Sequence, residues 1–431
     1  MKIRLRTIRL LSGLSLATAV VCAPGAQAQL AHASASTLAL AGNNTAWVRG
    51  FGAISVNPAG LGMPGSGFSL AVIPVRARLG LAPVTLSELA DFEGVLIPAT
   101  TKELWLDRIV DAGGQEGSVG ASATAFALTL GNLGFQLSTV ASADVVIPAG
   151  LAEALLYGNA GRTGTATDLS LAGASIESFA VTTAAMSLAI PINDALVLGA
   201  TGKYVQGHGL AVARSLSGAL ESDPIRGTLE FAAVTTCTDD AEVLCDQDFA
   251  NGGSGVGVDV GAMLDLGDLT LGASIQNLVN TFEWDETLLG YRPGTLLVED
   301  GTTDTDFEEQ PFENAPADLK EIVRDFTFRP SFQLGAALEV SSALTLTGDI
   351  HGELGDGISV GQGYHTGVGA ELRAGFVHLR AGLAKISDGM QYGGGLSLVL
   401  GPVNLSLAGG LQRGDNRDSA MGQFVLSFGN R

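Results

Sequence analysis

Apolar and polar residues alternate along much of the chain with the two-residue period of β-strands. In Phe328–Val340, an apolar face includes Phe328, Leu334 and Leu338, whereas Gln333 and Glu339 belong to the opposite one. The pattern recurs and predicts fourteen strands. They are Gly67–Leu81, Gly117–Leu130, Gly134–Ala143, Ser175–Ile190, Ala195–Leu210, Gly255–Leu266, Leu269–Val279, Thr327–Val340, Leu344–Leu354, His365–Arg373, Val377–Ile386, Gly393–Leu400, Val403–Leu411 and Met421–Phe428.

Short turns and longer polar segments alternate between these strands. The short turns are Gly131–Leu133, Pro191–Asp194, Gly267–Asp268, Ser341–Ala343, Ala374–Phe376 and Gly401–Pro402. The long segments are Ala82–Glu116, Asp144–Ala174, Ala211–Ser254, Asn280–Phe326, Gly355–Tyr364, Ser387–Tyr392 and Gln412–Ala420. Outer-membrane barrels show this asymmetry, with an even strand number and short periplasmic turns. We therefore expect an all-β, 14-stranded antiparallel transmembrane β-barrel. Arg226–Val234 is also strand-like, and we assign it to the loop above the barrel because a fifteenth strand would make the count odd.

A soluble antiparallel sheet could show the same alternation, with its apolar face buried in a core. The N-terminus favours lipid instead. Met1–Ala28 has a basic start, an apolar run at Leu10–Val21 and a small-residue cleavage site at Ala26–Ala28, as secretory signals do. We expect residues 1–28 to be a signal peptide and the mature chain to reach the bacterial outer membrane.

The charge and the cysteines of the chain indicate which partners and which cross-link to expect. The chain has 23 Lys and Arg against 44 Asp and Glu, so we expect no nucleic acid as a partner. Cys237 and Cys245 lie in the third long loop, and export to an oxidising compartment predicts a disulfide between them.

Residues 29–66 precede the first strand and form the expected second unit, before a barrel at residues 67–428. This segment contains Ala39–Ala46 (ALAGNNTA) and Ser55–Leu61 (SVNPAGL). It resembles the N-terminal hatch of FadL-type outer-membrane transporters, and a similar pattern occurs in PorV-like proteins of the type IX secretion system. The resemblance implies a hatch inside the lumen and maps the family's Asn-Pro-Ala motif onto Asn57, Pro58 and Ala59.

Two features depart from that family. FadL-type proteins end in an aromatic residue that the barrel-assembly machinery recognises, whereas here Phe428 is followed by Gly429, Asn430 and Arg431. Aromatic residues make up only 6% of the chain. Both features indicate a distant relative, although the barrel-assembly machinery remains an expected partner.

The first two long loops and the fourth contain segments of helical character. Leu86–Phe92, Thr100–Ala112 and Pro316–Phe326 are expected helices, and Thr100 with Glu103 fits a capping box. In the second loop, another short amphipathic helix is indicated by Leu151, Leu155, Leu156 and Tyr157. Apolar stripes on such helices could pack together as a lid or form a groove for a lipophilic ligand. The candidate ligand-binding residues of this groove are Leu104, Trp105, Ile109, Leu155 and Tyr157.

Two clusters of polar residues are more simply structural. The fourth long loop is strongly acidic, and without fixed ligand spacing we expect a solvated surface rather than a calcium site. His351, His365 and His378 belong to the expected lumen face with Asp349 and other charged residues. We expect them to join wall and hatch, and we select no catalytic residue, metal ligand or cofactor.

The favoured function is passive uptake of small hydrophobic compounds, fatty-acid-like or aromatic, as the FadL resemblance implies. Outer-membrane lipids and lipopolysaccharide would surround such a barrel, and the hydrophobic small molecule would be its ligand. The alternatives are a PorV-like component that binds secreted proteins and, third, a barrel enzyme.

Overall fold

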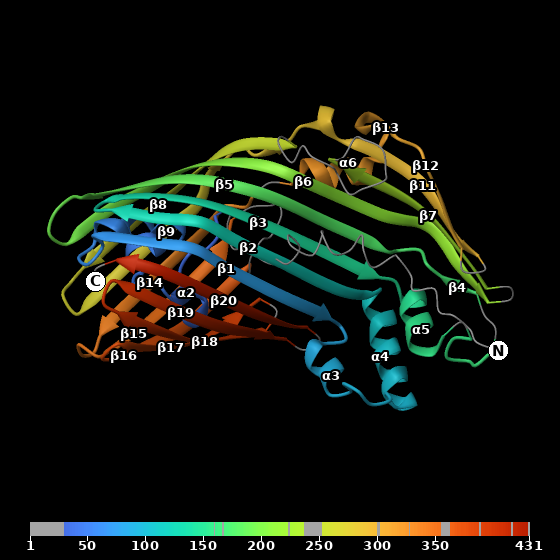
Figure 1. Cartoon of the computed structure of the whole chain (residues 1–431), viewed down its shortest axis with the longest axis horizontal. Helices are drawn as coiled ribbons and strands as arrows, with labels where there is room; N and C mark the ends of the chain where they lie inside the picture. The colour runs from blue at the N-terminus through green and yellow to red at the C-terminus, as the bar shows by residue number, and fades with distance from the viewer. Residues whose placement is uncertain are drawn as a thin grey trace, which may run out of the picture.

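The computed structural model describes residues 30–158, 160–165, 168–222, 225–236, 252–299, 302–326, 328–354, 363–387, 389–414 and 417–429. Fourteen strands form a closed antiparallel barrel, as the sequence predicts (Figure 1). In order around the wall they are β1 Phe68–Ala82, β2 Gln115–Leu130, β3 Leu133–Ile147, β5 Ser175–Pro191, β6 Leu196–Ser222, β8 Gly253–Asp265, β9 Leu269–Asn280, β14 Ser331–Glu339, β15 Leu344–Glu353, β16 Tyr364–Ala374, β17 Val377–Ile386, β18 Gly389–Leu400, β19 Val403–Arg413 and β20 Asp418–Gly429. Leu70 of β1 pairs with Phe428 of β20 and closes the wall.

The outer surface of the wall is apolar. One register row joins outward side chains of six successive strands, each of them exposed: Leu372, Leu379, Leu396, Leu407, Phe424 and Val75. Exposed aliphatic side chains in continuous rows suit a hydrocarbon environment and not water. Within the described residues, no helix has the length and apolar character needed to cross a membrane.

The lumen contains the N-terminal segment, residues 30–66. It forms α2 Ala35–Ala39 and two 3-10 turns, η2 Gly50–Ser55 and η3 Pro58–Gly62. In Figure 1 this segment, in dark blue, lies within the wall near the end with the short turns. Most of its residues are buried, because the wall encloses them.

The outward connections carry the remaining structure, at the opposite end of the barrel (Figure 1). They comprise α3 Leu86–Ala90, α4 Ala99–Ala112, α5 Ala149–Tyr157, β4 Leu169–Ser170, β7 Ile225–Thr235, β10 Glu283–Trp284, η4 Glu286–Leu288, β11 Gly290–Glu299, β12 Thr302–Phe307, β13 Gln310–Pro311, η5 Phe312–Asn314 and α6 Ala317–Arg324. β7 pairs with the outer part of β6 and with β11, so Arg226–Val234 does belong above the barrel.

Two of the predicted long loops are wrong. Ser387–Tyr392 is no long loop, because β17 ends at Ile386 and β18 begins at Gly389. The connection expected at Gln412–Ala420 shrinks to residues 414–417, because β19 and β20 both extend into it. Most of Gly355–Tyr364 lies outside the described residues.

The predicted capping box at Thr100 is also absent. Helix α4 begins after Pro98 without a side-chain cap, because the proline ring already fixes the backbone at the helix start. The capping box occurs instead at α3, where Thr85 and Glu88 bond each other's backbone amides.

Candidate functional site

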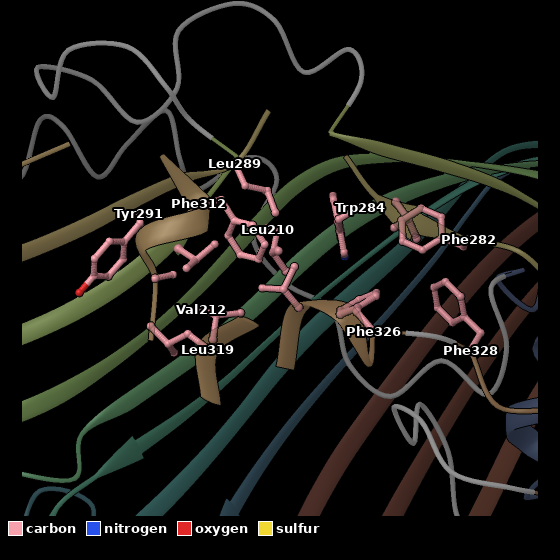
Figure 2. Packing of buried hydrophobic residues seen from close by; sticks show 14 of the residues in the cluster. Leu210, Val212, Phe282, Trp284, Leu289, Tyr291, Phe312, Leu319, Phe326 and Phe328 are labelled. Carbon is pink, nitrogen blue, oxygen red and sulfur yellow. The ribbon is translucent and has the colours of Figure 1, made fainter. Parts of the chain in front are cut away.

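Aromatic rings from three parts of the chain meet in the outer half of the lumen (Figure 2). We call Phe179, Phe282, Trp284, Phe326 and Phe328 the aromatic cluster. Ring centroids of Phe179 and Phe326 are 4.8 Å apart, those of Phe282 and Trp284 5.3 Å, and those of Trp284 and Phe326 5.5 Å. All three pairs are edge-to-face, the arrangement that aromatic quadrupoles favour.

Aliphatic side chains surround these rings. Strand β6 contributes Val205, Leu210 and Val212, and α6 contributes Leu319 and Val323. The cluster thus joins the barrel wall to the fourth long connection, which folds inward over the lumen.

Sequence reasoning missed this cluster. It described the fourth loop by its acidic residues and placed Phe328 on the lipid-facing side of a strand. Strand β14 begins only at Ser331, and Phe328 is 3% exposed inside the cluster. The available signal was the set of aromatic residues that flank the acidic run at Phe282, Trp284 and Phe326.

The candidate groove residues of α4 and α5 divide between a buried core and the exposed surface. Trp105 and Ile109 point into a small core with Ala152, and the ring of Phe92 meets that of Trp105 at 5.6 Å. Leu104 is 57% exposed and Leu155 71% exposed. Tyr157 is half-buried and carries the Lys102 ammonium 5.6 Å from its ring centroid. This arrangement fits helices that pack on each other better than an apolar groove.

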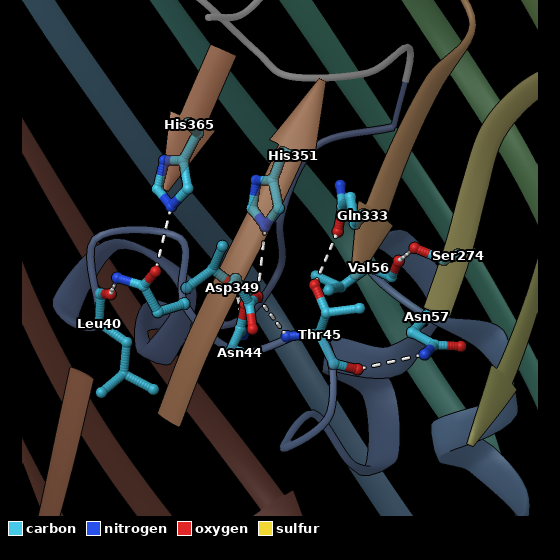
Figure 3. Close-up of polar contacts among 12 residues, drawn as sticks. Leu40, Asn44, Thr45, Val56, Asn57, Ser274, Gln333, Asp349, His351 and His365 are labelled. Carbon is cyan, nitrogen blue, oxygen red and sulfur yellow. Dashed lines mark hydrogen bonds and ion pairs between the residues drawn. The ribbon is translucent and has the colours of Figure 1, made fainter. Parts of the chain in front are cut away.

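Asn57 lies fully buried between the N-terminal segment and the wall (Figure 3). Its amide nitrogen donates to the carbonyl oxygens of Thr45, at 3.1 Å, and of Ala262 in β8, at 3.2 Å. Its amide oxygen accepts from the backbone N–H of Ala59 at 3.2 Å. Pro58 begins η3 and Ala59 is fully buried. One side chain therefore fastens two turns of the segment to the wall.

A second set of contacts joins the segment to the C-terminal strands (Figure 3). The backbone N–H of Thr45 donates to Asp349 Oδ2 at 2.8 Å, and this oxygen lies 3.2 Å from His351 Nε2. His365 Nε2 lies 3.1 Å from Asn43 Oδ1, and its ring stacks on that of His351 at 4.3 Å. The histidines thus lie where the sequence placed them, between wall and segment.

A group of charged residues in the lumen is joined by ion pairs around Glu371. Glu371 accepts from Arg380 at 2.6 Å and from Arg373 at 2.8 Å, while Arg373 covers the ring of Trp47 at 4.9 Å. His378 lies 3.9 Å from the same carboxylate. These contacts join β16, β17 and the N-terminal segment, so the expected lumen ion pairs are present.

Glycines of the wall allow this close approach. They lie opposite one another on neighbouring strands, and we call them the glycine rows. The rows are Gly369–Gly382–Gly393–Gly410, Gly199–Gly261 and Gly272–Gly335. A Cβ on Gly393 would lie 2.3 Å from the carbonyl oxygen of Leu38, and one on Gly199 would lie 2.3 Å from the amide nitrogen of Ala59. The segment's backbone therefore rests directly on the backbone of the wall.

The acidic fourth loop is solvated, as expected. Every residue of β12 is exposed. Arg324 donates to both carboxylate oxygens of Glu286, at 2.6 and 2.9 Å, and this hydrogen bonding lowers the pKa of Glu286. Cys237 and Cys245 lie outside the described residues, so their disulfide stays a prediction.

Comparisons with known proteins agree with this architecture. A family of unknown function (DUF5723) matches residues 116–287, less than half of the chain, and no curated protein matches. A mutant of the monoaromatic hydrocarbon channel TodX is similar in structure, with a TM-score of 0.56 and 12% identity over 92% of this chain and 98% of that one. The Pseudomonas putida toluene transporter TodX aligns with a TM-score of 0.50 and 12% identity, over 93% of this chain and 98% of that one. A Pseudomonas aeruginosa FadL homologue aligns with a TM-score of 0.49 and 12% identity, over 93% and 98%. At this identity the similarity establishes the fold: the chain has the barrel fold of the FadL-type hydrophobic-compound channels.

Proposed function

We propose that the protein is a channel of the bacterial outer membrane for passive uptake of small hydrophobic compounds. The observation that carries this proposal is the aromatic cluster above a lumen that the N-terminal segment fills. A channel for polar solutes needs a continuous water path, which this segment obstructs. An apolar compound needs instead an apolar surface, because its transfer from water to such a surface is favourable.

The outer end of the lumen supplies the apolar surface, and the inner end obstructs the water path. Phe282, Trp284 and Phe326 offer ring surfaces behind an acidic, hydrated loop. Beneath them, the bonds of Asn57 and Asp349 hold the N-terminal segment against the wall. The likeness in fold to a structure described as a toluene transporter supports the same function.

Neither alternative gains comparable support. A PorV-like component would bind secreted proteins, and no contact among the described residues favours that over uptake. An enzyme would need reactive groups, whereas His351, His365 and His378 each lie within reach of a polar neighbour that fixes the wall.

Uptake by whole cells tests the proposal. Cells with intact lipopolysaccharide that express the protein should accumulate radiolabelled ethylbenzene or oleate faster than vector-only cells, but not labelled raffinose. Phe326→Ala should slow this uptake several-fold, because it removes the ring that contacts most of the cluster. Phe376→Ala, which changes an exposed ring at the opposite end of the barrel, is the matched control and should leave uptake unchanged.

Conductance in planar bilayers gives the second criterion. The intact protein should conduct almost no ions, and deletion of residues 29–66 should open a water-filled path. A large, steady conductance from the intact protein would identify an open porin and refute hydrophobic uptake.

A further inference from the structure

The aromatic cluster contains one polar group that has no partner. The indole nitrogen of Trp284 is buried, and it makes no hydrogen bond within the part of the chain that the structure describes. The whole residue is only 6% exposed. Buried polar groups are nearly always paired, because an unpaired donor loses its bond to water and gains nothing. An orphaned donor in an otherwise apolar site therefore indicates a missing acceptor.

The Trp284 ring is held in place by its neighbours. The rings of Phe282 and Phe326 meet it edge-to-face, with interplanar angles of 87° and 74°. Figure 2 shows the nitrogen at the end of the ring that faces the interior of the cluster, on the side of Phe326. A ligand that enters between these rings would meet the N–H directly.

The lysine beneath the cluster does not favour an anionic ligand, because it is already paired. Lys203 lies on β6, two residues from Val205 of the cluster's surroundings and on the same lumen face. Its ammonium donates to Asp259 Oδ1 and to Asn277 Oδ1, both at 2.6 Å, and its side chain is 0% exposed. This cation is already neutralised, so it offers no counter-ion to a carboxylate, whose burial without one is very costly.

We propose that the aromatic cluster binds uncharged aromatic compounds that carry one hydrogen-bond acceptor, such as a ketone or ester oxygen, with the Trp284 N–H as the donor. This inference rests on the proposed uptake function and names its ligand class. The flat ring of the ligand takes an edge-to-face place among Phe282, Phe326 and Trp284. Its oxygen then supplies the acceptor that the indole lacks.

Two probes of equal size separate the acceptor from the apolar body. Acetophenone carries a carbonyl oxygen where ethylbenzene carries a methylene group. Equilibrium dialysis of the purified full-length protein in detergent, against protein-free micelles, would measure both affinities. Acetophenone should show about fivefold tighter binding relative to its micelle partition than ethylbenzene, which corresponds to about 1 kcal/mol for one net hydrogen bond.

Trp284→Phe is the decisive variant, because it keeps an aromatic ring and removes the N–H. It should abolish the acetophenone preference and leave ethylbenzene binding within about twofold. Trp105→Phe, in the separate core of α4 and α5, is the matched control and should keep the preference. The carbonyl stretch of ¹³C-labelled acetophenone gives an independent readout, with a downward shift in the native protein that Trp284→Phe removes.

The outcomes separate this inference from the function on which it rests. Ethylbenzene binding without an acetophenone preference, or a preference that survives in Trp284→Phe, would overturn the inference and leave uptake of hydrocarbons standing. If neither probe bound, both the inference and the uptake proposal would be overturned.

Discussion

The two halves of the lumen are filled in opposite ways. The half near the short turns holds backbone that is fixed by hydrogen bonds involving Asn57, Asp349 and Gln276 and lies against glycines of the wall. The outer half holds aromatic and aliphatic side chains that contact one another without directional bonds. Hydrogen-bonded backbone has one satisfied geometry, whereas packed side chains can adopt new rotamers at modest cost. The difference indicates that the outer half adapts to a ligand while the inner half stays closed.

The largest effect is expected when a side chain is added to a glycine row. Gly393→Val would place carbon atoms against the carbonyl oxygens of Leu38 and Ala39, which belong to the segment's backbone. We expect the segment to be forced off β18, with a loss of at least about 1–3 kcal/mol, typical of overpacking, and a large rise in ion conductance.

The adjacent residue provides the control. Gly394 has no atom within 4 Å of an added Cβ and belongs to the outward face of the same strand. Gly394→Val should leave the bilayer conductance near zero. It should also leave unchanged the electrophoretic mobility of the folded barrel in unheated samples. If Gly393→Val behaved in the same way, the close seating of the segment would be contradicted.

A smaller effect is expected from Asn57→Ala. The change removes three hydrogen bonds and leaves the Ala262 carbonyl without this donor, at a cost of about 1–3 kcal/mol for each buried group left unpaired. Brief openings should appear in single-channel records in place of a permanently open path. Asn404→Ala, which changes a wall asparagine with an unpaired amide oxygen, is the control and should stay closed. Equal records for the two variants would argue against Asn57 as an anchor.

The smallest effect concerns pH at the outer rim. Burial alone would raise the pKa of Glu88, but its hydrogen bonds with Thr85 and Arg108 outweigh this and lower it from an ordinary value near 4.5. A lowered folded-state pKa means that the stabilisation is complete above the unfolded pKa. It is lost as the pH falls through the folded value.

Hydrogen exchange of the α3 amides, corrected for intrinsic rates, would measure this loss. Protection should fall as the pH drops below about 4.5, whereas the Val48 amide in the inner half, which donates to the carbonyl of Asn44, should keep its protection. The variant Glu88→Gln should remove the pH-dependent part at the Thr85 amide, which donates to Glu88. A uniform loss across both regions would mean that the two halves are not independent.

The sequence predicts the wall well because lipid enforces a strict two-residue period on every strand. Leu334 and Leu338 face outward and Gln333 inward, as the alternation indicates. The prediction fails at Phe328, because this side chain packs into the aromatic cluster and the strand begins only at Ser331. The aromatic residues around the acidic run mark part of the cluster, but local patterns could not add Phe179, which is far from Phe326 in the chain. Leu104 and Leu155 are exposed. Helical spacing shows which residues share a face of a helix, but it does not show what that face contacts.

The contacts of the N-terminal segment also constrain how the barrel is built. The carbonyl oxygen of His32 accepts a hydrogen bond from Gln423, 391 residues later, and Asn43 reaches the carbonyl of Val368 across 325 residues. The part of the chain that emerges first thus finds several of its partners in the strands that emerge last. Contacts of such long sequence separation form slowly. Because the glycine rows bring the segment's backbone against the wall, we expect the last hairpins to close around the segment before β20 meets β1.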